Sequence, residues 1–105
     1  MLEDLNQEIF EPFVHSRFAV YDEARNKVTM ELIEVAGNSS NPKIENFSLI
    51  FRGPVEPLLP QKIYTFDHPK IGAFALFIVP IAMQPDGLRY QAVFNRLREV
   101  PKGRS

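Results

Sequence analysis

The chain has 105 residues, enough for one domain with one core, and its 45% apolar content with nine Phe and three Tyr is typical of a globular protein. Twelve basic residues nearly balance thirteen acidic ones, which argues against a nucleic-acid or membrane partner. The absence of cysteine excludes disulfides, thiolate metal ligands and cysteine nucleophiles.

No apolar run approaches the roughly 20 residues of a membrane span. The N-terminus carries acidic residues where a secretory signal would have a basic start. We therefore expect a cytoplasmic protein.

Residues 1–15 form a predicted N-terminal helical segment. The apolar residues recur at spacings of three and four, and Pro12 limits the length of the helix; they are Leu2, Leu5, Ile9, Phe10 and Phe13. Because so short a helix is unstable alone, its apolar side must pack on something larger. We expect it to plug an open end or face of a sheet.

Short alternating apolar runs separated by Pro and Gly follow, and they predict antiparallel strands. The expected strands cover residues 17–21, 28–35, 47–52, 63–66, 73–81 and 88–94. In the second strand the apolar phase changes parity between Leu32 and Ile33, which predicts a β-bulge there. Residues 37–43, GNSSNPK, form the best candidate for a mobile loop.

Three later segments carry specific expectations. Residues 73–81 are apolar on both parities, which is typical of a central strand buried on both sides. Residues 84–87 predict a tight turn, with Leu88, Tyr90, Ala92 and Phe94 facing inward on the returning strand. Residues 96–105 mix charge with Pro and Gly and are expected to form a flexible tail.

These elements predict a single, mainly β domain over residues 1–105. Its six or seven antiparallel strands form a meander whose apolar face needs a second layer or closure on itself. We therefore expect a small barrel or a two-sheet sandwich with one short N-terminal helix.

Candidate chemistry is sparse. Asp67 precedes His68, but neighbours on a strand point to opposite faces, so a turn histidine bonded to backbone is favoured over a catalytic one. His15 has the same interpretation. Two histidines are few for a metal, since zinc usually takes three or four ligands. We predict no catalytic residue, no metal and no cofactor.

The remaining polar groups favour structural roles. Glu31 alternates with apolar neighbours and should face solvent, and Arg52 is expected to pin a turn by pairing with Glu56 or Asp67. The proline-rich segment 54–60 matches a polyproline II ligand, but a rigid connection with Leu58 and Leu59 on the core is favoured. The basic residues near the C-terminus are interpreted as a solvated surface rather than a nucleic-acid contact.

The whole chain resembles a family of bacterial proteins catalogued only as domain of unknown function 6916. The resemblance is carried by the stretch from Phe10 to Phe18 and by Phe47, Phe51, Gly53, Pro54, Tyr64, His68, Gly72, Pro80, Tyr90, Phe94 and Asn95. The genes of that family often lie near phage-tail-like proteins, which implies a structural or accessory role and no activity.

We therefore expect a non-enzymatic module that binds a protein partner or forms a homo-oligomer, as an accessory of a phage-tail-like assembly. Unpaired strand edges would suit such a partner. The alternative is a small-molecule-binding barrel or weak hydrolase, with its pocket formed by His68, Tyr64 and His15.

Overall fold

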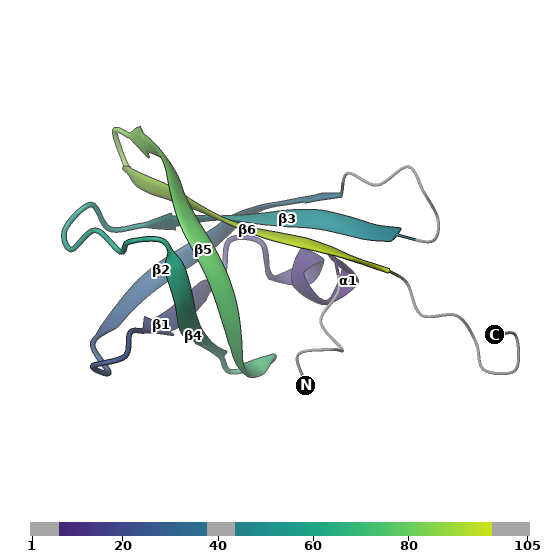
Figure 1. Ribbon diagram of the computed structural model, residues 1–105, viewed down its shortest axis with the longest axis horizontal. Coiled ribbons are helices and arrows are strands. Elements are labelled where there is room, and N and C mark those ends of the chain that lie inside the picture. The colour runs from purple at the N-terminus through teal and green to yellow at the C-terminus, as the bar shows by residue number, and fades with distance from the viewer. Residues whose placement is uncertain (1–6, 38–43, 98–105) are drawn as a thin grey trace, which may run out of the picture.

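The computed structural model describes residues 7–37 and 44–97, which form a short helical segment and six strands (Figure 1). The helical part is α1 (Gln7–Phe10) followed by the 3-10 turn η2 (Glu11–Phe13). The strands are β1 (Arg17–Tyr21), β2 (Lys27–Gly37), β3 (Ile44–Gly53), β4 (Lys62–His68), β5 (Gly72–Gln84) and β6 (Gly87–Leu97). Residues 38–43 of the predicted loop and 98–105 of the predicted tail lie outside the described residues, whereas residues 96 and 97 belong to β6.

The strands form a closed barrel in the order β1-β2-β3-β6-β5-β4, with every neighbouring pair antiparallel. The predicted mainly β fold with a short helix near the N-terminus is therefore confirmed, in its barrel form. The strand order departs from a simple meander at one point, because the β3–β4 connection crosses one end of the barrel. Strand β3 consequently pairs with β6, from Ile44 opposite Leu97 to Gly53 opposite Leu88.

Two register shifts shape the barrel. In β2, Leu32 pairs with Phe51 and Glu34 with Ile50, so the predicted bulge is confirmed, with Ile33 as the additional residue. The second shift lies in β5, between Pro80 and Ala82. Strand β5 pairs with β4 through residues 72–78 and with β6 through residues 79–84. The long strand thus passes from one neighbour to the other near its middle.

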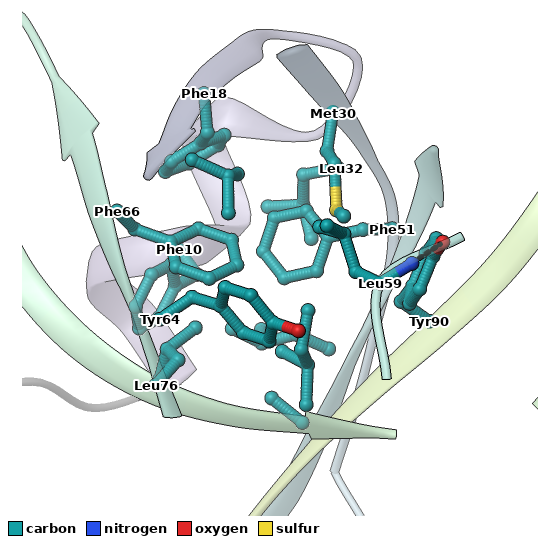
Figure 2. Packing of buried hydrophobic residues seen from close by; sticks show 14 of the residues in the cluster. Phe10, Phe18, Met30, Leu32, Phe51, Leu59, Tyr64, Phe66, Leu76 and Tyr90 are labelled. Atoms are coloured by element: carbon teal, nitrogen blue, oxygen red, sulfur yellow. Dashed lines mark hydrogen bonds between the residues drawn. The ribbon is translucent and has the colours of Figure 1, made fainter. Parts of the chain in front are cut away.

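Apolar side chains from all six strands fill the barrel interior (Figure 2). The fully buried strand residues are Phe18, Val20, Met30, Leu32, Phe47, Leu49, Phe51, Phe66, Ile78 and Tyr90. Leu88, Tyr90 and Ala92 of β6 are buried and Phe94 packs against the core, as the alternation predicted. Burying each such side chain is worth about 1.5–3 kcal/mol, which makes this interior the main source of stability.

The helical segment closes the end of the barrel at which β5 and β6 are no longer paired. Phe10 is fully buried there, and its ring centre lies 6.4 Å from that of Phe47, 5.7 Å from Phe74 and 6.0 Å from Phe94. These rings belong to β3, β5 and β6, so one side chain spans the gap between strands. The predicted plug is confirmed, and its burial explains why so short a helix forms.

The connection between β3 and β4 covers the opposite end. The Tyr90 hydroxyl accepts a hydrogen bond from the Leu59 N–H (3.1 Å) and donates one to the Pro54 carbonyl (3.0 Å). The Tyr64 hydroxyl donates to the Pro60 carbonyl (2.6 Å). Leu59 is buried as predicted, but Leu58, predicted to lie on the core as well, is half exposed.

The expectation that β5 is buried on both sides is wrong. Phe74, Leu76 and Ile78 face the interior, whereas Phe77 on the other parity is 50% exposed. A barrel has one interior, so the fold covers only every second side chain of an apolar strand. The outward apolar residues of β5 are therefore left at the surface.

Candidate functional site

His68, the first candidate from the sequence, lies at the end of β4 and is buried. Its ring packs against those of Phe13 and Phe18, with centre-to-centre distances of 4.7 Å and 4.6 Å. Its Nδ1 accepts a hydrogen bond from the Lys70 N–H (3.0 Å), and its Nε2 lies 3.0 Å from the Ser16 Oγ. The histidine thus joins the turn after η2 to the β4–β5 turn.

The hydrogen bonds fix the tautomer of His68. Because Nδ1 accepts from backbone, the neutral ring carries its proton on Nε2 and donates it to the Ser16 Oγ. The Ser16 hydroxyl in turn donates to the Phe13 carbonyl (2.9 Å). Neither nitrogen is available to take the serine proton, so this serine and histidine form a structural contact rather than a nucleophile and its base.

Burial lowers the pKa of His68 from its usual 6.5, and the charge of Lys70 acts in the same direction. The carboxylate of Asp67 opposes the shift but does not outweigh burial. The ring is therefore neutral at pH 7. This is the bonded turn histidine that the sequence favoured over a catalytic one.

The other two pocket candidates lie elsewhere. The His15 side chain is 75% exposed and its Nδ1 is 3.5 Å from the Glu31 Oε2, while its backbone adopts a φ of 78°. Tyr64 lies four residues before His68 on β4, about 13 Å away along the strand, with its hydroxyl on Pro60. Burial raises the pKa of Tyr64 above its usual 10.0, which keeps the hydroxyl protonated. The structure does not bring the three side chains together.

A shallow depression of about 250 Å³ lies beside Tyr64 at the end of the barrel that the β3–β4 connection covers. It is lined by the β1–β2 turn, the connection and the start of β4. The polar groups around it already have partners: Asn26 binds the Asp22 carboxylate, and Lys62 lies 3.7 Å from Glu23. Drug-sized ligand pockets are typically about 300–1,000 Å³, so this depression is small for a ligand site.

A polar groove is lined by residues of β1, β2 and β3 together with Pro54 and Asp86, and its charged side chains are Arg17, Glu31, Arg52 and Asp86. A ladder of ion pairs runs through it and continues to Arg89 on β6. Glu31 binds Arg52 on the neighbouring strand, Arg52 lies 3.4 Å from Asp86, and Asp86 lies 3.0 Å from Arg89. Burial opposes ionisation of Asp86, but its hydrogen bonds and charge contacts with Arg89 and Arg52 outweigh this and lower its pKa. The charges neutralise one another, which favours a structural role.

This ladder corrects the predicted partner of Arg52. The sequence suggested Glu56 or Asp67, because both are near in the chain. The register of β2 and β3 instead places Arg52 directly opposite Glu31. The Glu31 side chain, expected to face solvent, is only 19% exposed as a result.

One feature of the described residues has no role in the fold: a group of exposed apolar side chains on β4, β5 and β6, which we call the β5 face. Its members are exposed apolar side chains on these three strands: Ile63, Phe77, Ile81 and Val93. Ile63 (62% exposed) lies directly opposite Phe77 in the β4–β5 register, and Val93 is 61% exposed on β6. Met83 extends the surface near the tip of the β5–β6 hairpin.

The sequence analysis missed this surface and also missed Ser16. The signal for the β5 face was present, since β5 contains no charged residue and is apolar on both parities. That signal was interpreted as burial. No local signal marks Ser16, because its partner His68 is 52 positions away in the chain.

Among residues 7–37 and 44–97, no cluster of three or more His, Asp or Glu side chains is arranged to hold a metal ion. Within the same part of the chain, no helix has the length and apolar character needed to span a bilayer.

Comparison with known proteins identifies the family. No curated protein and no solved structure matches the chain. The family model for the domain of unknown function DUF6916 matches residues 5–94, which extend from the plug to the end of the inward alternation on β6. The chain therefore belongs to the DUF6916 family, as its resemblance suggested.

Proposed function

We propose that this protein is a non-enzymatic interaction module that docks onto another protein surface through the β5 face. The observation that carries the proposal is the pair Ile63 and Phe77, which lie opposite each other on neighbouring strands and are each at least half exposed. Apolar patches of this kind on small proteins are typical of interaction sites. Ile81 on β5 and Val93 on β6 are exposed as well.

The rest of the surface supports this choice. In the polar groove, Glu31, Arg52 and Asp86 are joined by ion pairs. The depression beside Tyr64 is small, and Asn26 and Lys62 beside it have partners. His68 uses both ring nitrogens in hydrogen bonds. A docking surface accounts for the exposed apolar side chains, whereas a ligand pocket near His68 would leave them without a role.

The biological context that we propose comes from the family resemblance: an accessory of a phage-tail-like assembly in the cytoplasm of a bacterium. The exposed apolar side chains of the β5 face support attachment of such an accessory to another protein. The identity of the captured partner decides this context.

The test is affinity capture of the tagged protein from its native host at low expression, followed by mass spectrometry. We compare Ile63→Glu, which places a charge in the β5 face, with Thr29→Glu, which places the same charge on an exposed position of β2. The proposal predicts a stoichiometric partner, or self-association, that Thr29→Glu retains and Ile63→Glu loses. Equal capture by both variants, or no association by the wild type, would overturn it.

A further inference from the structure

Segment 72–78 of β5, which carries Phe77 of the β5 face, has a free strand edge. Residues 72–78 of β5 pair with β4 on one side, and pairing with β6 begins only at Val79. Strand β6 pairs with β5 only through residues 87–91, although its other edge pairs with β3 from Leu88 to Leu97. Within the described residues, the other edge of segment 72–78 has no strand partner, and α1 lies against β2 and touches β5 through Phe10. Its outward N–H and C=O groups are available for another strand.

This edge lacks the features that protect other edges. Natural edge strands carry charged side chains, proline or a bulge, which discourage pairing with a second chain. Strand β5, with the sequence GAFALFIVPIAMQ, contains no charged residue, and its Pro80 and its register shift both come after the free segment. The segment is therefore regular, uncharged and apolar on its outward side.

These properties suit a second copy of the same strand. A two-fold contact uses the same edge of both copies, so every residue of the strand pairs with another residue of that strand and the central residue faces its own copy. A strand without charged residues forms such a contact without desolvating or opposing any charge. Strand β5 has none.

Building on the proposed function, we propose that the partner at the β5 face is a second copy of this chain, joined by antiparallel pairing of the two β5 edges. Pairing that uses all of segment 72–78 is centred on Ala75. It places Ala73 of one copy opposite Phe77 of the other, a small side chain beside a large one. The two barrels then share one continuous sheet with the outward apolar residues at its centre.

The chain has no cysteine, so single cysteines report this pairing without background. Directly opposed residues in antiparallel strands have Cβ atoms about 4.5–5.5 Å apart, close enough for a disulfide after small adjustments. Ala75→Cys should cross-link to itself under mild oxidation. Ala73→Cys should not, because the two copies of residue 73 lie about 13 Å apart along the strands. Thr29→Cys on β2 is the control for random collision.

Light scattering of the full chain gives the second readout. The proposal predicts a mass of twice 12.1 kDa at high protein concentration. It also predicts that Ala75→Lys, which opposes two charges at the centre, is monomeric, while Ala75→Ser remains dimeric. Circular dichroism of both variants verifies that the barrel is folded.

The outcomes separate this inference from the proposed function. A dimer whose cross-link is strongest at residue 75 supports both. A dimer that cross-links equally at Thr29→Cys, or not at Ala75→Cys, overturns the β5 pairing. A monomer at all concentrations also overturns it, but if the wild type still captures a host protein that Ile63→Glu loses, the proposed function stands with a different partner.

Discussion

Replacing Tyr90 with phenylalanine tests how the β3–β4 connection is held across the end of the barrel. The change keeps the ring, which is fully buried, and removes only the hydroxyl. That hydroxyl bonds both the Leu59 N–H (3.1 Å) and the Pro54 carbonyl (3.0 Å). The substitution therefore removes two contacts of the connection without opening a cavity.

The expected cost follows from what each partner loses. The Leu59 N–H is in a buried environment, and a buried donor without a partner costs about 1–3 kcal/mol. The Pro54 carbonyl belongs to a partly exposed residue and can bind water instead, so losing its hydrogen bond to Tyr90 adds less to the destabilisation. We expect Tyr90→Phe to lower the free energy of unfolding by about 2 kcal/mol.

Urea unfolding measures this difference. With an m-value of about 1–3 kcal/mol/M, the midpoint should fall by about 1 M. Tyr64→Phe is the matched control, because its hydroxyl makes one bond, to the carbonyl of the exposed Pro60, and it should cost less than about 1 kcal/mol. If Tyr90→Phe lay within about 0.5 kcal/mol of the wild type, or matched Tyr64→Phe, the proposed anchoring would be refuted.

Three further predictions concern the plug, the packing behind β3 and the buried histidine. Phe10→Ala should lower the free energy of unfolding by about 3–5 kcal/mol, because the ring contacts Phe47, Phe74 and Phe94. An unchanged urea midpoint would show that α1 does not close the barrel. Gly53→Ala should cost about 1–3 kcal/mol in thermal unfolding, since its Cβ would lie 2.8 Å from the Tyr90 ring and 3.1 Å from Met30; a neutral effect would contradict this packing. His68 has a lowered pKa when folded, so the unfolded chain binds more protons as pH falls below 6.5. The contribution of neutral His68 to the free energy of unfolding should be fully present above pH 6.5 and decrease below it. The free energy of unfolding should therefore depend less steeply on pH in His68→Gln than in the wild type. Equal slopes in the two proteins would argue against a buried neutral ring.

Alternation and turn residues were sufficient to predict a mainly β domain that is either a barrel or a two-sheet sandwich, the bulge and the β5–β6 hairpin. The bulge could be located because the apolar parity changes between Leu32 and Ile33, and register confirms it. The plug followed from the physical instability of a short apolar helix. These features depend on neighbouring residues, so a single sequence contains the information.

Features that depend on distant pairing were not predictable in the same way. The β3–β6 ladder and the Glu31–Arg52 pair both depend on which strands become neighbours after the chain crosses the barrel. The contact between Ser16 and His68 joins residues 52 positions apart. No local pattern specifies these contacts.

The candidate site illustrates a third limit. An apolar residue in a strand predicts that the side chain avoids water, but it does not say whether the fold or a partner covers it. Phe74 and Phe77 look alike in the sequence, yet one faces the interior and the other the surface. The outward side of β5 was therefore interpreted as core until the barrel showed which side is outward.

Amide hydrogen exchange of β5 is the most direct test of the central claim that this strand's outward apolar face and free edge form an interface. Exchange of residues 72–79 should slow as protein concentration rises, or on adding a captured partner, while residues 27–31 of β2 remain unchanged. Protection of β5 that is the same at every concentration and with every partner, or protection that appears at β1 and β2 instead, would contradict the account.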